Sequence, residues 1–466
     1  MALARALDVS FDALVSLKLE QEITPAVVPE TPLLQKFPFQ MFGISAKDLN
    51  ELIADHPREM GTLVGVLTEF GKTYDLRAEH FYHTALRTYQ ILHRNFFPDL
   101  EKAVSRFRNH LGWPENHCPR FEELWSLVRE RYGYRPYDPG PDDSLETMRS
   151  VMFHRKGELY MNAALTPQQK AFVVAREIGY QELGITERAY NAPSLEVGSF
   201  EQVINNFHAA YFADSLMVPM ARLRLELESL FRQDQWDPNR FAGLFKVFHI
   251  TPEMLLYRLS AVLPKTMGLP NILLLKFTRA RRVMAINPEG QEQENTEGSQ
   301  SGSRRRGTRR KSDIKVQLSK QLNMSRIPLP DGMNANEHFC RRWRPLQILD
   351  DLERQGESPL VIGAQRSRFT DAEDELFCIS MAYPDSMNPR EIAAMSIGFQ
   401  MDEAFRKQVR FHGDPAIQLT LLGQTCERCP LSLEECDERV APPHIYEAEQ
   451  VKEAHRKHLA RLLDQF

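Results

Sequence analysis

This 466-residue chain lacks long apolar runs, abundant cysteine and a large net charge, its formal net charge being −5. No stretch approaches 18 consecutive apolar residues, which argues against a transmembrane helix, and the first twenty residues lack the basic start and cleavage site of a signal peptide. Six cysteines are too few for a disulfide scaffold. Because 58 Lys and Arg residues are nearly balanced by 63 Asp and Glu residues, the chain has no overall positive charge that would attract nucleic acid. We therefore expect a cytoplasmic protein without membrane contact, long enough for about three domains.

Helical periodicity dominates the patterns that are present. Apolar residues recur mainly at three- and four-residue spacing in many segments, for example within 216–230. Extended runs are few: residues 151–162 predict two short strands joined by a turn at Lys156 and Gly157, and residues 374–383 predict another strand. Because helices and strands are segregated along the chain, the predicted fold class is α+β, mostly helical.

Composition divides the chain into four parts. Residues 288–313 contain no large apolar side chain, so they cannot offset their ordering entropy and are predicted to be a disordered linker. Six cations between Arg304 and Lys311 could contact phosphates, but a solvated linker is the simpler interpretation because no aromatic residue is interleaved. A softer boundary lies near 134–145, where prolines and glycines end a helical region. The other predicted parts are a helical region at 1–135, a domain at 136–287 and a small α+β domain at 314–466.

One predicted helix occupies the place of a peptidase motif. Residues 166–184 begin with a Thr166 cap and contain the phrase AREIGYQEL, where zinc peptidases carry H-E-x-x-H. In that motif two histidines ligate zinc and the glutamate activates the metal-bound water. Here Arg176 and Tyr180 stand at the two ligand positions, and an arginine cannot lose its proton to bind a cation. Glu177 thus has no activated water beside it, and we predict that the chain has no catalytic residues.

Three of the six cysteines fall within eleven residues near the C-terminus. Cys426 and Cys429 form a Cys-x2-Cys turn that can present two thiolates to one metal, and Cys436 can close the same loop. A fourth ligand could be Cys340 or Cys378. Four thiolates suit zinc and an iron–sulfur cluster equally well, and reduced cysteines without metal are the remaining alternative.

Several phrases together resemble the short-chain fatty acyl transcriptional regulators of the propionate-catabolism type, which contain an ImmA/IrrE-type metallopeptidase domain. LMVP (216–219) matches the end of a helix in that domain, and FCRRW (339–343) and CERCPLSLEECDERVAPP (426–443) match the C-terminal domain. The resemblance covers about residues 48–443. It implies a four-iron (4Fe–4S) cluster, with zinc as the alternative, and a CoA or acyl-CoA ligand between the last two domains. The implied cluster ligands are Cys340, Cys426, Cys429 and Cys436.

The function implied by this resemblance is a cytoplasmic, homo-oligomeric transcriptional regulator or sensor of short-chain acyl-CoA metabolism with an inactive peptidase-like domain. Family members open with a helix-turn-helix, whereas only residues 3–14 resemble its last helix here, so DNA binding by this chain alone stays open. One alternative is a metallo-endopeptidase with an altered ligand set of Glu177, His208 and Glu201. Another is an interaction protein that binds a full-length relative.

Overall fold

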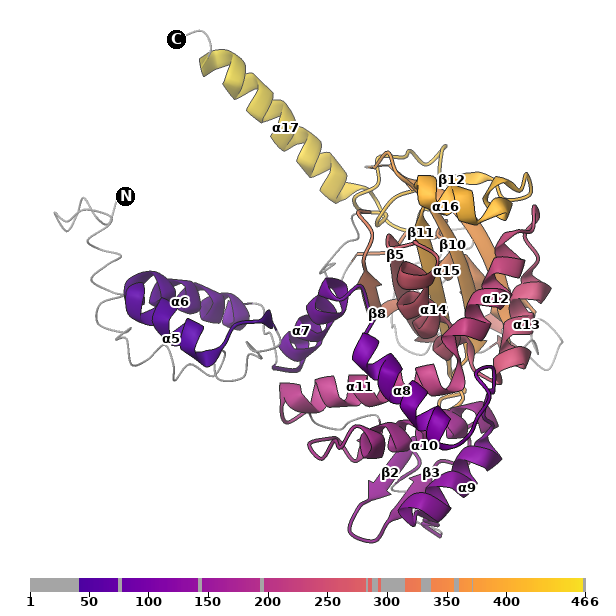
Figure 1. The fold of residues 1–466 in the computed structure, drawn as a ribbon. Coiled ribbons are helices and arrows are strands. Elements are labelled where there is room, and N and C mark those ends of the chain that lie inside the picture. The colour runs from indigo at the N-terminus through magenta and orange to yellow at the C-terminus, as the bar shows by residue number, and fades with distance from the viewer. Residues whose placement is uncertain are drawn as a thin grey trace.

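The computed structural model describes residues 42–73, 78–140, 145–192, 197–281, 284–286, 292–294, 315–327, 337–355, 360–370 and 372–463. The helices are α5 (Ala46–Asp55), α6 (Pro57–Thr73), α7 (Ala78–Leu92), α8 (Pro98–His110), α9 (Phe121–Tyr132), α10 (Pro167–Glu182), α11 (Phe200–Met217), α12 (Met220–Phe231), α13 (Pro238–Phe248), α14 (Pro252–Thr266), α15 (Arg344–Arg354), α16 (Glu403–Gln408) and α17 (His444–Leu463). Most of α8 to α13 lie together next to a large sheet, α14 and α15 pack on that sheet, and α5, α6 and α17 project away (Figure 1); this mixture confirms the predicted α+β class.

The smaller sheet has the strand order β1-β3-β2-β4 and contains the predicted hairpin. Met152 pairs with Leu159 in the antiparallel register, and Gly157 adopts a φ of 66°, a turn conformation that a side chain would disfavour. The prediction of two strands around a Lys156–Gly157 turn is therefore confirmed. The strands of this sheet are β1 (Arg135–Pro136), β2 (Ser150–Phe153), β3 (Glu158–Met161) and β4 (Asn191–Ala192).

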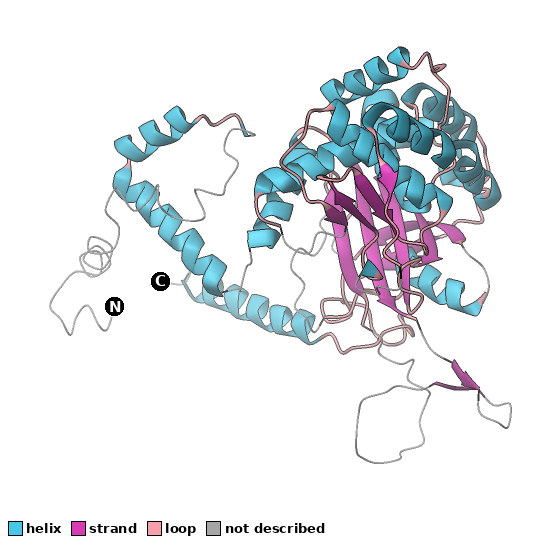
Figure 2. Cartoon of the chain, turned by 90° about the horizontal axis from the view of Figure 1, so that it is seen from below, coloured by secondary structure: helices cyan, strands magenta, loops and turns pink. Residues whose placement is uncertain are grey.

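The larger sheet has six strands in the order β12-β9-β10-β11-β5-β8, all antiparallel except the β12–β9 pair. Helices cover both of its faces: α14 contacts β5 and β11, while α15 contacts β9, β10 and β11 (Figure 2). Successive side chains alternate between these faces, as Leu274 packs toward the main core and Leu273 and Leu275 pack toward α15. The strands are β5 (Ile272–Ala280), β8 (Gln317–Asn323), β9 (Val361–Phe369), β10 (Glu375–Pro384), β11 (Glu391–Gln400) and β12 (Leu419–Leu422).

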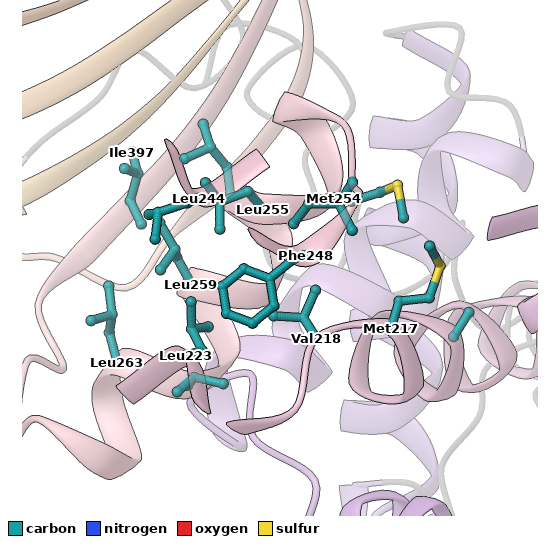
Figure 3. Packing of buried hydrophobic residues seen from close by; sticks show 14 of the residues in the cluster. Met217, Val218, Leu223, Leu244, Phe248, Met254, Leu255, Leu259, Leu263 and Ile397 are labelled. Carbon is teal, nitrogen blue, oxygen red and sulfur yellow. The ribbon is translucent and has the colours of Figure 1, made fainter. Parts of the chain in front are cut away.

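The main apolar core joins the helices to this sheet (Figure 3). Leu223, Phe248 and Leu259 come from three successive helices, Ile397 comes from β11, and all four side chains are fully buried. Burial of such a side chain contributes roughly 1.5–3 kcal/mol. One cluster therefore contains residues from both the helical part and the sheet, and the two parts share a continuous apolar core.

Two predicted boundaries differ from the structure. Strand β5 lies inside the six-stranded sheet although it precedes the predicted boundary at 287. Within the predicted linker, residues Glu292–Glu294 form β7, which pairs with β6 (Met284–Ile286). The linker prediction therefore does not hold at these three residues, and the rest of 288–313 lies outside the described residues, as does the segment 3–14. Among the described helices, none is both long and apolar enough to span a bilayer.

Candidate functional site

Helix α10 carries the residues that stand in the peptidase-motif positions. The Thr166 hydroxyl accepts a hydrogen bond from the Gln169 amide and completes a capping box, which confirms the predicted start of the helix. The helix approaches α11 so closely that a Cβ atom on Gly179 would lie 2.9 Å from the carbonyl oxygen of Ala209. This close packing places Glu177 in the interior of the protein.

The guanidinium of Arg188 hydrogen bonds to both carboxylate oxygens of Glu177. Arg188 donates from Nη1 to Oε2 at 2.9 Å and from Nη2 to Oε1 at 2.7 Å, and the Glu177 and Arg188 side chains are only 2% and 6% exposed. The guanidinium carbon also lies 3.8 Å from the centre of the Tyr180 ring. Burial by itself would lower the pKa of Arg188, but the adjacent carboxylate outweighs burial and raises it. The glutamate at the motif position therefore forms a buried ion pair with Arg188.

Tyr134 completes this buried group. Its hydroxyl donates to Oε2 of Glu177 at 3.3 Å and accepts a hydrogen bond from Nε2 of Gln181 at 2.9 Å. Burial, and then the negative charge of Glu177, raise the pKa of Tyr134 to about 12. The phenol is therefore protonated at neutral pH and does not supply an anionic ligand.

The two residues at the motif's ligand positions bind other protein groups. Arg176 Nη2 donates to Oγ of Ser150 at 3.3 Å, and the Tyr180 hydroxyl donates to Oδ1 of Asn206 at 2.8 Å. Burial raises the pKa of Tyr180. The polar ends of both side chains therefore stabilise the domain interior.

The altered metal-ligand set of the endopeptidase alternative is not assembled. His208 lies among the rings of Tyr89, Phe97 and Phe207, with centroid distances of 6.3, 6.3 and 5.8 Å, and burial lowers the pKa of His208 to about 4. Glu201 is exposed in the first turn of α11. Across the described residues, no three His, Cys, Asp or Glu side chains are placed to hold a metal ion.

The cysteine-rich tail pairs with the FCRRW segment. The Cys426 amide donates to the His338 carbonyl at 2.9 Å, and the Cys340 amide donates to the Gln424 carbonyl at 3.3 Å. These bonds bring together segments that are 86 residues apart in sequence, counted from Cys340 to Cys426. The thiols of this region are free and buried, and they comprise Cys340, Cys426, Cys429 and Cys436.

Two other thiols contribute to the electrostatic environment of Cys340. The pKa of Cys340 is raised to about 11, with burial as the largest cause, and the nearby Cys426 and Cys429 act in the same direction. The backbone amides of Arg342 and Gly423 act in the opposite direction by hydrogen bonding to the Cys340 sulfur. Amide hydrogen bonds to sulfur are also a feature of iron–sulfur sites, so the chemistry of these donors fits a thiophilic metal. As placed within the described chain, the thiols do not form a ready metal-binding group.

Arg439 holds the backbone of the cysteine loop. Its Nη1 donates to the Cys426 carbonyl at 3.0 Å, and its Nη2 donates to the Cys429 carbonyl at 3.1 Å and to the Leu431 carbonyl. Position 423 also requires glycine, because a Cβ atom there would lie 2.7 Å from the sulfur of Cys429. The loop conformation therefore depends on residues outside the Cys-x2-Cys turn.

A polar cluster, which we call the junction cluster, lies where α11 and α14 meet the large sheet. Glu253 accepts from Lys276 Nζ at 2.7 Å and from Lys320 Nζ at 3.1 Å. Burial alone would raise the pKa of Glu253, but the two ammonium groups hold it below its usual value. Because two cations share one carboxylate, these three residues retain a net positive charge.

Two buried oxygen atoms near Glu253 have no hydrogen-bond partner among the residues that the structure describes. They are Oδ1 of Asp214 and the hydroxyl of Tyr383, and both groups are close enough to feel the charge of Glu253. Burial raises the pKa of Asp214 to about 8, so its carboxyl group is mainly protonated at neutral pH. With the two lysines, the junction cluster presents several hydrogen-bond donors, and the Lys320 side chain, 54% exposed, connects them to solvent.

Sequence reasoning missed Arg188 and the junction cluster. Arg188 follows Glu177 by eleven residues, beyond the end of α10, so no helical spacing relates the two. The residues of the junction cluster come from five separate elements, and no motif in the sequence links them. They are Asp214 (α11), Glu253 (α14), Lys276 (β5), Lys320 (β8) and Tyr383 (β10).

Comparisons with known proteins identify one domain. Residues 138–260 match the family model described as the IrrE N-terminal-like domain, a peptidase family. A solved structure described as a Mycobacterium tuberculosis transcriptional regulator is similar over 76% of this chain and 93% of that chain, with 16% sequence identity and a TM-score of 0.47. No curated protein matches the chain. The chain thus contains an IrrE-like domain that includes Glu177 and Arg188, whereas the cysteine tail lies outside the matched range.

Proposed function

We propose that this chain is a cytoplasmic transcriptional regulator of the short-chain fatty acyl type, with an IrrE-like domain that serves sensing or docking instead of hydrolysis. The observation that carries the proposal is the buried pair of Glu177 and Arg188. A peptidase glutamate must take a proton from a metal-bound water, whereas this carboxylate is already bound on both oxygens by an arginine. The phrases FCRRW and CERCPLSLEECDERVAPP support the regulator assignment.

Absence of metal-dependent proteolysis is the first prediction. Purified protein supplied with zinc is expected to leave casein and candidate repressor substrates uncut at any concentration, and a chelator is expected to change nothing. The physical reason is that Arg188 excludes a water-activating role for Glu177. Chelator-sensitive cleavage that is abolished by Glu177→Gln would establish the endopeptidase alternative. Glu182→Gln, on the same helix but more exposed, is the matched control.

We propose that the junction cluster contacts the regulatory ligand. Its lysines, the protonated Asp214 and the Tyr383 hydroxyl are all donors, and a CoA thioester offers phosphate and carbonyl acceptors in return. The cluster contains residues of both the IrrE-like domain and the large sheet. The affinity of a ligand bound there would therefore depend on how these two parts are arranged. A ligand changes a conformational equilibrium only through such differential affinity.

Calorimetry with propionyl-CoA, acetyl-CoA, CoA and propionate tests this ligand assignment. Lys320→Ala and Tyr383→Phe are each expected to weaken acyl-CoA binding by about tenfold or more, because each removes one donor to the ligand. Lys407→Ala, an exposed lysine on α16, is the control and is expected to bind as the wild type does. Unchanged affinity in both variants would show that the ligand binds elsewhere, and no binding of any CoA species would remove the acyl-CoA proposal.

We further propose that Cys340, Cys426, Cys429 and Cys436 hold an iron–sulfur cluster, with zinc as the alternative. Four buried free thiols, with backbone amide hydrogen bonds to the sulfurs of Cys340 and Cys426, support this. A bound cation would also reverse the burial-induced preference for the neutral thiol. Such a cluster would supply redox sensitivity, while the chain's own residues hold the loop in place.

Anaerobic purification tests the metal proposal. We expect a brown protein with iron and acid-labile sulfide, and loss of both in Cys426→Ala or Cys429→Ala. Cys118→Ala is the matched control, because Cys118 lies in the helical part and hydrogen bonds to the Asn116 carbonyl. A colourless protein with one zinc per chain would favour the structural-zinc alternative, and metal-free protein would exclude both.

Gel shifts separate the regulator from the interaction-protein alternative. Slower migration of a DNA fragment that contains the promoter of this protein's gene, in the presence of this chain alone, would show direct DNA binding. A shift that requires a relative with a complete helix-turn-helix would show that this chain acts through a partner, because base reading needs a recognition helix.

A further inference from the structure

Helix α17 has no packing partner within the described chain. None of its residues is buried, and both views show it leaving the sheet domain (Figures 1 and 2). Only its start is held, where the amides of Ile445 and Tyr446 donate to the Glu427 carbonyl at 3.1 and 3.0 Å. Twenty residues form a rod of about 30 Å. Since most helical stability in proteins comes from tertiary packing, such a rod gains stability from a partner.

An apolar stripe runs along this helix. At 100° per residue, the stripe residues fall within one third of the circumference, an arc that also contains His444 and Lys452. Val451 and Leu459 are each 56% exposed, and Leu463 is 67% exposed. Large apolar side chains in such a row are unusual on a surface that contacts only water. The stripe consists of Ile445, Ala448, Val451, His455, Leu459, Leu462 and Leu463.

The charges of α17 are separated by sign along its length. Residues 444–453 contain three glutamates and one lysine, whereas residues 454–463 contain three arginines or lysines and no carboxylate. The helical repeat places Glu449 and Arg456 beside one edge of the apolar stripe and Glu447 beside the other, whereas Arg461 lies about 80° beyond that second edge. One edge therefore has a carboxylate in the first half of the helix and a guanidinium in the second half.

We propose that α17 pairs with α17 of a second copy of this chain in antiparallel orientation. In such a pair the two-fold axis is perpendicular to both helices. Each edge of the apolar stripe then lies beside the same edge of the partner helix, which runs in the opposite direction. The acidic half then meets the basic half twice, and the apolar stripes cover each other. A parallel pair would instead place acidic half against acidic half, which like-charge repulsion disfavours.

Analytical ultracentrifugation of the full-length protein tests this pairing. We expect a monomer–dimer equilibrium with a dissociation constant on the order of 1 μM, typical of a small interface. Leu459→Glu with Leu462→Glu is expected to raise that constant at least ~100-fold, since two apolar contacts are lost on each side of the dyad. Both side chains are exposed in one chain, so the variant is expected to match the circular dichroism spectrum and melting temperature of wild-type protein diluted below that constant, where the wild type is also monomeric.

Charge reversal tests the orientation. Glu447→Arg with Glu449→Arg, and separately Arg456→Glu with Arg461→Glu, are each expected to weaken the dimer about tenfold, because each makes both halves alike in sign. The chain with all four changes restores opposite signs between the halves and is expected to dimerise as the wild type does. A parallel pair would gain nothing from combining the changes.

Three outcomes would overturn the proposal. The first is a wild-type protein that stays monomeric up to 100-fold above the expected constant of roughly 1 μM. The second is a dimer that tolerates Leu459→Glu with Leu462→Glu, which would place the interface elsewhere. The third is a monomer that binds anionic phospholipid vesicles through α17, since an amphipathic basic helix half can also contact a membrane surface.

Discussion

Arg188→Ala is expected to lower the free energy of unfolding of the IrrE-like domain by about 3–5 kcal/mol. The substitution removes the guanidinium from both oxygens of Glu177, whose side chain is 2% exposed, and leaves a buried carboxylate without its cation. It also removes the stacking partner of the Tyr180 ring. Denaturant unfolding followed by circular dichroism measures the loss as a lower midpoint at an unchanged slope.

Exposed and compensated variants provide the controls for this experiment. Arg224 pairs with Glu228 at 2.7 Å but is 56% exposed, so Arg224→Ala is expected to cost at most about 1 kcal/mol. Combining Arg188→Met with Glu177→Gln removes both charges and is expected to recover most of the lost stability. An Arg188→Ala protein as stable as the wild type would show that Glu177 does not depend on this arginine, and the proposal of a blocked site would fail.

Arg258→Ala is expected to destabilise the protein at least as strongly, by about 3–5 kcal/mol. Arg258 is 1% exposed and binds Glu101 through two hydrogen bonds of 2.5 and 3.1 Å. It also donates to the Ser215 hydroxyl at 2.7 Å and to the Val218 carbonyl at 3.0 Å. These contacts join α8, α11 and α14, so the variant leaves the Glu101 carboxylate without its cation, although the Tyr211 and Ser215 hydroxyls still donate to it, and removes a donor from the Val218 carbonyl.

The conservative variant at this position distinguishes charge from geometry. Arg258→Lys keeps a cation for Glu101 but cannot donate in the planar, forked arrangement, so we expect an intermediate loss of stability. Thermal melting of the three proteins should therefore give the order wild type, then Lys, then Ala. Equal melting temperatures for the wild type and Arg258→Ala would contradict the role of this arginine in joining the three helices.

Local chemistry made several elements predictable. The Thr166 cap and the apolar periodicity after it predicted α10 to within two residues, because capping and helical repeat act over four residues or fewer. The turn at Lys156 and Gly157 predicted the β2–β3 hairpin for the same reason. By contrast, β11 has no alternating pattern, since helices cover both faces of the large sheet and nearly all its side chains are buried.

By itself, the sequence determined the α+β class, the helix in the peptidase-motif position, the arginine and tyrosine at its two ligand positions and the spacing of the cysteines, since these depend on short-range periodicity and residue type. Only the tertiary structure decided that Arg188 binds Glu177, that the junction cluster forms and that no described part of the chain buries α17. Ion pairs between separate elements depend on how those elements pack. Packing brings together residues whose distance along the chain follows no repeat.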